Sequence, residues 1–125
     1  MRDYHLVQLL KSGDVEEFNR IRPPVLDLRW SELNDLVLPG VNFSGADLRQ
    51  TNLARTDLTG ANLRGAILEE ANLQGAILRR VNLCRAILRN ANLSHSELRE
   101  VYAREADFRG ARLDGAKIED DKFAA

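Results

Sequence analysis

Residues 61–100 read ANLRG-AILEE-ANLQG-AILRR-VNLCR-AILRN-ANLSH-SELRE, eight blocks of five residues with one shared pattern. The third residue of every block of five is Leu, the first is small, and the last two are mostly polar. The same frame runs from Leu26 to Ala125 as twenty blocks. Their central positions hold Leu in fifteen blocks, Phe in three and Ile in one, and Ala103 is the exception. A repeat this long and uninterrupted predicts a repetitive architecture.

A period of five fits neither regular element alone. On an α-helix, each five-residue step turns the side chain by about 140°, so the leucines would share no face. On a plain strand, successive leucines would alternate between the two faces, because the side-chain period is two and five is odd. A chain that turns a corner every five residues fits, since the central residue and the residue two before it then point the same way. The leucines would fill the axis and the small residues would leave them room.

This A-[DN]-L-x-x pattern resembles the pentapeptide-repeat family over residues 26–125. The resemblance implies an all-β solenoid, a right-handed quadrilateral β-helix with four blocks in each coil. Twenty blocks then make about five coils, and strand spacing makes the rod roughly 24 Å long. We therefore expect two parts, an N-terminal helical cap over residues 1–24 and a pentapeptide-repeat β-helix over residues 25–125.

The first part of the chain has the pattern of two short helices. Gly13 can end the first, and Asp14 with Glu17 three residues later resembles a capping box for the second. Pro23-Pro24 stops that second helix. The stretch Phe18-Asn19-Arg20-Ile21-Arg22 is similar to the leaders of other pentapeptide-repeat proteins. Trp30, in the first coil, is expected to pack beneath this cap.

The position before each central residue points outward in such a coil. Asn occupies it in alternate blocks from Asn42 to Asn92, as expected of corner residues whose side chains bond to nearby backbone. The other blocks hold three isoleucines, and a row of exposed apolar residues suggests an interaction surface. Together with two neighbouring arginines, the candidate surface is Ile67, Ile87, Ile77, Arg89 and Arg109.

Purely structural interpretations of the same residues, without a binding role, stay open. Isoleucine forms strands well and can stand at an outward position for that reason alone. The arginines can belong to a solvated face, with ladder salt bridges to Glu69, Glu70, Glu100 and Glu105.

The C-terminal coil has no recognisable cap. Its axial positions hold Phe108, Leu113, Ile118 and Phe123. Either the last residues fold over this edge or the edge pairs with another molecule, because an open β edge has to be covered. The family resemblance adds the possibility of an end-to-end homodimer through these four residues, and monomer and dimer remain equal alternatives.

The composition and the motifs of the chain give few candidate residues for catalysis or for binding a metal or cofactor. Eighteen basic and nineteen acidic residues give a net charge of -1, which gives no reason to expect nucleic-acid or membrane partners. Cys84 is the only cysteine, which is compatible with the cytoplasm; it has either no role or a reactivity raised by Arg64 and Arg104 above and below it. His5 and His95 make no metal-ligand spacing, and no phosphate-binding or nucleophile motif appears. We expect no cofactor, no metal and no enzyme activity.

Two functions follow from these expectations. The first is a non-catalytic protein–protein interaction or scaffold module that presents the faces of its β-helix to a macromolecular partner. The second comes from the resemblance, because some fluoroquinolone-resistance members of the family mimic duplex DNA and bind a type II topoisomerase. This chain departs from those members, since it is near neutral, rich in arginine and without a projecting loop.

Overall fold

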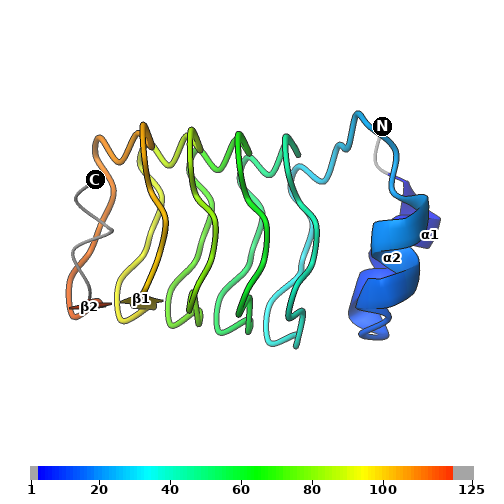
Figure 1. Ribbon diagram of the computed structural model, residues 1–125, viewed down its shortest axis with the longest axis horizontal. Coiled ribbons are helices and arrows are strands. Elements are labelled where there is room, and N and C mark those ends of the chain that lie inside the picture. Colours follow the sequence, from blue (N-terminus) through cyan, green and yellow to red (C-terminus); the bar gives the residue numbers. More distant parts are fainter. Residues whose placement is uncertain (1–2, 120–125) are drawn as a thin grey trace.

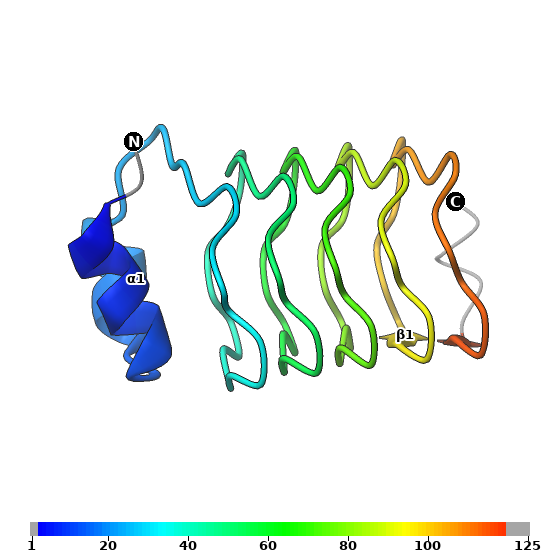
Figure 2. The same ribbon diagram turned by 180° about the vertical axis from the view of Figure 1, so that it is seen from behind.

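The computed structural model describes residues 3–119 and shows a rod of stacked coils with two helices at its N-terminal end (Figure 1). The helices are α1 (Tyr4–Lys11) and α2 (Val15–Ile21). Two short strands, β1 (Glu97–Arg99) and β2 (Lys117–Glu119), pair in parallel near the other end. Elsewhere the coils are joined by isolated parallel bridges. Both views, from the front and from behind, show the coils side by side along one axis (Figures 1 and 2).

Each coil takes twenty residues, because every bridge pairs residues twenty apart, as in Asp27 with Asp47. The coil has four sides, and we name each by its first bridge residue: the Asp27, Glu32, Val37 and Asn42 sides. The Asp27 side continues through Asp47, Ile67, Ile87 and Asp107, and the Val37 side through Asp57, Ile77, Glu97 and Lys117. The four-sided coil is the one that the family resemblance implies.

The residue at every corner has a left-handed backbone conformation, since every fifth residue from Trp30 to Gly115 has a positive φ. Glycine suits this conformation, as at Gly60 with φ 71°, and Arg55 adopts it at φ 58°. The asparagines before the centres stabilise the corners: Asn62 Oδ1 accepts a hydrogen bond from the Arg64 N–H at 3.0 Å. The interpretation of these asparagines as corner residues is confirmed.

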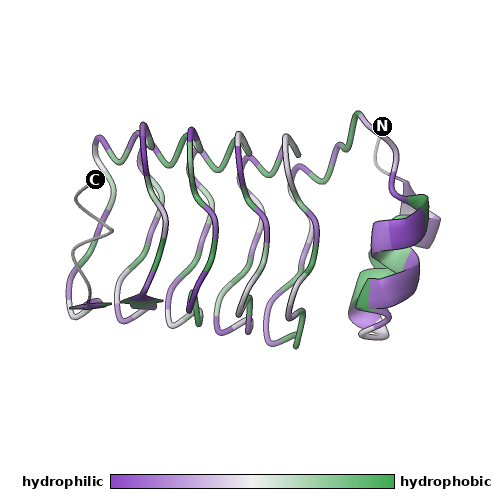
Figure 3. Cartoon of the chain, in the orientation of Figure 1, coloured by the Kyte–Doolittle hydropathy of each residue, from purple (hydrophilic) through white to green (hydrophobic). Residues whose placement is uncertain are grey.

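The core is the axis of the rod. Leu48, Leu68 and Leu88 stack at twenty-residue intervals and are fully buried, as are Ala46 and Ala66 beside them. Each buried leucine stabilises the fold by about 1.5–3 kcal/mol before conformational entropy is subtracted. Apolar and polar residues accordingly alternate along the coils (Figure 3).

The cap forms as its capping residues predict. Asp14 accepts from the Glu17 N–H at 3.1 Å and begins α2, while Gly13 with φ 80° follows the end of α1. Asp3, which the sequence analysis did not single out, caps α1. Phe18 of α2 is fully buried, and its ring meets that of Phe43 edge to face, with centroids 5.6 Å apart. The cap therefore shares one core with the rod.

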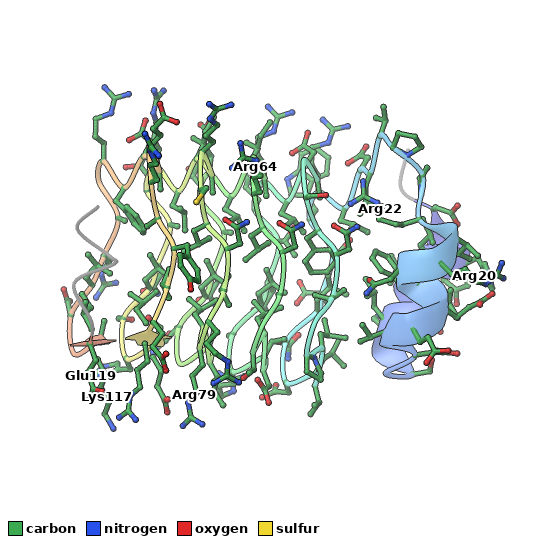
Figure 4. The ribbon with its side chains drawn as sticks, viewed as in Figure 1. Arg20, Arg22, Arg64, Arg79, Lys117 and Glu119 are labelled. Atoms are coloured by element: carbon green, nitrogen blue, oxygen red, sulfur yellow. The ribbon has the colours of Figure 1, made fainter. Side chains whose placement is uncertain are left out.

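Asn19 of α2 and Arg22, which directly follows α2, attach the cap to the open edge of the first coil. Asn19 donates to Gly40 O at 3.0 Å and accepts from the Asn42 N–H at 2.8 Å. Arg22 donates to Asn42 O at 3.1 Å and to Ser44 O at 2.9 Å. Figure 4 shows Arg22 at the junction of cap and rod. These bonds pair backbone groups that an uncovered edge would leave open.

Candidate functional site

The isoleucines of the candidate surface lie on two opposite sides. Ile67 and Ile87 form a bridge pair on the Asp27 side, and Ile77 lies on the Val37 side between Asp57 and Glu97. The structure therefore brings together two of the three residues and separates the third. Arg89 and Arg109 also belong to the Asp27 side, because each follows two residues after Ile87 and Asp107.

The isoleucines are less exposed than we expected. Ile67, Ile77 and Ile87 are all half-buried, because outward side chains stacked at strand spacing cover one another's flanks. The large apolar side chains with the greatest exposure among residues 3–119 are instead Tyr4, Val25, Trp30, Val37, Tyr102 and Ile118. The isoleucines point outward as expected but are only partly exposed, and their role as an interaction surface stays a prediction.

The two arginines bind one aspartate. Arg89 Nε lies 2.6 Å from Asp107 Oδ2, and Arg109 Nη2 lies 2.8 Å from the same oxygen. At the other end of the isoleucine pair, Arg49 Nη2 lies 2.6 Å from Asp47 Oδ2. Arginine–aspartate pairs thus flank the isoleucine pair on both sides along the rod.

These pairs differ from the ladder salt bridges expected with glutamates. Of the four glutamates named for that role, Glu105 has such a bridge, to Arg85 at 3.0 Å. The sequence does carry the signal for the aspartate pairs, a repeated Asp-x-Arg at 27–29, 47–49 and 107–109. At this spacing the two side chains stand on the same outward side of a short extended segment, so they meet without a partner from another coil.

The arginines also hold the aspartates in their charged form. The pKa of Asp107 is well below its ordinary range, chiefly because Arg109 and then Arg89 donate hydrogen bonds to it. The pKa of Asp47 is lowered in the same way, first by the hydrogen bond from Arg49. The surface around the isoleucine pair therefore carries matched charges of both signs at neutral pH.

Asp107→Asn should weaken the acid dependence of stability. A carboxyl whose pKa is lowered on folding contributes stability above its unfolded pKa of about 4, and loses it as the pH falls through the folded value. In the original protein, Asp107 Oδ1 accepts a hydrogen bond from the Arg109 backbone N–H at 3.1 Å. The side-chain oxygen of asparagine can accept the same bond, so the variant removes the charge and keeps this contact. We expect the melting temperature to fall less in the variant than in the original protein between pH 5 and pH 2, roughly the range around the pKa of an unfolded Asp. Parallel melting curves across this range would contradict the assignment.

The repeats themselves identify the family. A model described as pentapeptide repeats matches the chain in eight copies, over residues 27–65, 66–102 and 88–120. The chain belongs to the pentapeptide repeat family. Its fold is accordingly the family's right-handed quadrilateral β-helix.

Solved structures of other pentapeptide repeat proteins resemble this one. A protein from the Arabidopsis thaliana thylakoid lumen is 27% identical, with a TM-score of 0.49, and the match covers 82% of this chain and 74% of that one. HetL, involved in heterocyst differentiation regulation in the cyanobacterium Nostoc sp. strain PCC 7120, is 30% identical, with a TM-score of 0.45 and coverage of 74% and 48%. The plasmid-mediated fluoroquinolone resistance protein QnrB1 is 16% identical, with a TM-score of 0.38 and coverage of 76% and 63%. None of the curated proteins matches.

The predicted end-to-end interface of this pentapeptide repeat protein lies on its last coil. Phe108 and Leu113 are half-buried there, and Ile118 is 45% exposed in β2. Phe123 lies outside the described residues. The three described residues occupy three successive sides of one coil, as axial positions do, and their role in dimerisation stays a prediction.

Within residues 3–119, no three His, Cys, Asp or Glu side chains gather as a metal site would require. His5 lies in α1 and His95 at a corner of the rod. Cys84 is a half-exposed free thiol, in a shallow notch that Arg64 and Arg104 also line. In the same part of the chain, neither helix has the length and apolar character needed to cross a membrane.

Proposed function

We propose that this pentapeptide repeat protein is a non-catalytic protein-binding module, and that the Asp27 side is its binding face. The observation that carries the proposal is the Ile67–Ile87 pair between the Asp47–Arg49 and Asp107–Arg109 pairs. An apolar centre within a rim of satisfied polar groups is how protein interfaces are organised. Arginine is also enriched among the residues that contribute most to such interfaces.

The rod favours binding in a second way. Its side chains are held on a backbone hydrogen-bonded from coil to coil, as in Ile67 N to Ala46 O at 2.9 Å and Ile87 N to Ala66 O at 2.9 Å. A partner therefore meets a surface that is already ordered, so little conformational entropy is lost on association. The Arg–Asp pairs add to this, because each charge already has its partner before a second protein arrives.

The proposal includes the absence of catalysis and a cytoplasmic location. Family members of this kind are generally binding or structural modules. The lone Cys84 suits a reducing compartment, and the Arabidopsis protein shows that the fold itself also occurs in a thylakoid lumen. A homodimer through Phe108, Leu113, Ile118 and Phe123 stays part of the proposal as a second use of the rod.

A topoisomerase-binding DNA mimic is the alternative that the sequence raised, and no observation on this surface favours it. Duplex DNA presents closely spaced negative charge. The Asp27 side instead alternates aspartates with Arg29, Arg49, Arg89 and Arg109, and the whole chain has a net charge of only -1. The similarity to QnrB1, at 16% identity, gives no support for a shared function.

Ile67→Lys with Ile87→Lys should abolish capture of the partner. Two like charges stacked on one ladder repel each other and replace the apolar centre with solvated groups. The experiment compares three immobilised proteins in native cell extract by quantitative mass spectrometry: the original, the double variant, and an Ile77→Lys control that carries its charge on the opposite side. We expect a partner captured by the original and by the control and lost, by about tenfold or more, from the double variant. Equal capture by all three proteins would place the binding face elsewhere.

A further inference from the structure

The notch around Cys84 lies on the corner of the rod that follows the Asn42 side. Its volume is about 280 Å³, and it is lined by Arg64, Cys84, Arg85, Arg104 and Glu105. Figure 4 shows Arg64 in the upper part of the rod, whereas Arg79, which follows the Val37 side, projects from the bottom. The notch therefore belongs to a different edge of the rod than the Val37 side.

Two arginines of the notch lack the partner that other arginines of the rod have. Arg49 binds the aspartate two residues before it, at 2.6 Å. On the Asn42 side, the same position holds Asn62 before Arg64 and Tyr102 before Arg104, and neither side chain offers a carboxylate. Within residues 3–119, the side chains of Arg64 and Arg104 accordingly form no ion pair and no hydrogen bond.

The one carboxylate among the lining residues is already bound. Arg85 Nε lies 3.0 Å from Glu105 Oε1. The pKa of Glu105 is lowered, first by the hydrogen bond from Arg85 and to a smaller extent by the charges of Arg104 and Arg64. The last two guanidinium groups thus lie near the same carboxylate without bonding to it. Three guanidinium groups against one carboxylate leave the notch with two positive charges, which belong to Arg64 and Arg104.

The two unpaired arginines can reach one ligand together. They stand two coils apart on one ladder, roughly 10 Å between backbones by strand spacing, with the short side chain of Cys84 between them. The corner beside Arg64 is Gly65, and a side-chain carbon there would meet no atom within 4 Å. This open space lets both guanidinium groups approach an anion above the thiol from opposite sides.

We propose that the notch binds a phosphate monoester on a side chain of the partner polypeptide, held between Arg64 and Arg104. A phosphorylated side chain carries nearly two negative charges and three acceptor oxygens, whereas a carboxylate has one charge and two oxygens. Each guanidinium can therefore pair with the phosphate through oxygens of its own. The volume of about 280 Å³ equals that of roughly nine water molecules at about 30 Å³ each, which leaves room for a phosphate group and the end of its side chain.

The isoleucine pair favours a polypeptide as the carrier of the phosphate, and this part of the proposal rests on the proposed function. Ile67 follows Arg64 by three residues, at most about 11 Å of chain. A polypeptide with its phosphate in the notch can therefore place an apolar neighbour on the isoleucine pair. Free phosphate would bind weakly, because the arginines are exposed and salt screens their charge. Duplex DNA would also bring closely spaced phosphates to the aspartates of the adjacent Asp27 side.

Cys84 provides the test, because it is the only cysteine and its alkylation by iodoacetamide reports on the notch alone. The thiol is the reporter and takes no part in binding. The probes are the peptide Gly-phosphoserine-Gly-Gly-Ile-Leu-Gly, the same peptide with unmodified serine, inorganic phosphate and a short DNA duplex. We expect the phosphopeptide to slow alkylation in a saturable way, and the unmodified peptide to need a concentration about tenfold higher or more.

Two variants locate the effect, each compared with its own alkylation rate without a probe. Arg64→Gln with Arg104→Gln should abolish protection by the phosphopeptide. Arg80→Gln is the matched control, because Arg80 also has no ion pair within the described part of the chain and lies on the corner that follows the Val37 side. The control should be protected as the original protein is. Circular dichroism checks that both variants fold.

Several outcomes would overturn the proposal. Equal protection by the two peptides, or none by either, would remove the phosphate site. Inorganic phosphate that protects at the same concentration as the phosphopeptide would make the notch a site for small anions, and a duplex that protects at a lower concentration would make the partner a nucleic acid. Equal loss in the Arg80 control and the double variant would reduce the effect to net charge. All these proteins keep Ile67 and Ile87, so a failure of the isoleucine variants to lose the partner is a separate result.

Discussion

Leu68→Ala is expected to lower the free energy of unfolding by about 3 kcal/mol. Leu68 is fully buried at the axis, with Leu48 and Leu88 fully buried in the coils on either side. Its removal loses the transfer free energy of the side chain and leaves a cavity between two stacked leucines that cannot close without breaking the coil-to-coil hydrogen bonds. Urea titration followed by circular dichroism measures the change.

Leu113→Ala is the matched control for this prediction. Leu113 has the same axial role but is half-buried in the last coil, so its truncation should cost clearly less. Equal losses at the two positions would mean that stability does not depend on neighbouring coils as a stacked repeat requires.

Arg22→Ala is expected to cost about 3 kcal/mol, because it uncovers the first coil. The guanidinium donates to the carbonyls of Asn42, Ser44, Pro23 and Pro24, at distances from 2.9 to 3.2 Å. Its removal leaves the half-buried carbonyl groups of Pro23, Asn42 and Ser44 without this donor. Burial also lowers the pKa of Arg22, as expected for a cation taken out of water.

Two variants distinguish this role from simple loss of charge. Arg22→Lys should recover little of the stability, because an ammonium cannot reproduce the planar set of donors that reaches four carbonyls. Arg20→Ala should leave stability nearly unchanged, since Arg20 is well exposed and pairs with Glu17. If the Lys variant were as stable as the original, the hydrogen-bond geometry of Arg22 would not be what holds the cap.

Much of the fold follows from the spacing of its residues. The five-residue period predicts the corners and the inward pair, and both are confirmed in the buried leucines and in the positive φ at every fifth residue. The number of sides and the handedness do not follow from the period, because corners of several angles allow the same inward pattern. They came from the family resemblance. The cap was predictable because Gly13, Asp14 and Pro23 mark its boundaries locally.

The candidate site was harder to predict, since it depends on what covers each outward side chain. The sequence places Ile67 and Ile87 one coil apart, and the bridge between them agrees. It does not show that stacked neighbours leave them half-buried, nor that Arg109 turns back to Asp107 two residues away. Trp30 was expected to pack beneath the cap, and it lies beside α1 but stays 55% exposed. Its open half depends on the angle at which α1 meets the first coil, and no local pattern sets that angle.

Removal of whole coils can separate the Ile67–Ile87 pair from the rest of the Asp27 side. Deletion of residues 46–65 keeps the Ile67–Ile87 pair and stacks the Asp27–Arg29 pair where Asp47–Arg49 stood, whereas deletion of residues 66–85 removes Ile67 and stacks Ile87 on Asp47. Each deletion removes one full turn of twenty residues, so the frame and the cap contacts of the first coil are kept. The measurement is the affinity of both proteins for the partner captured by the original, after circular dichroism has shown that both fold. We predict that the protein lacking residues 46–65 binds and that the protein lacking residues 66–85 does not; two folded proteins that bind equally well would contradict the isoleucine pair as the binding face.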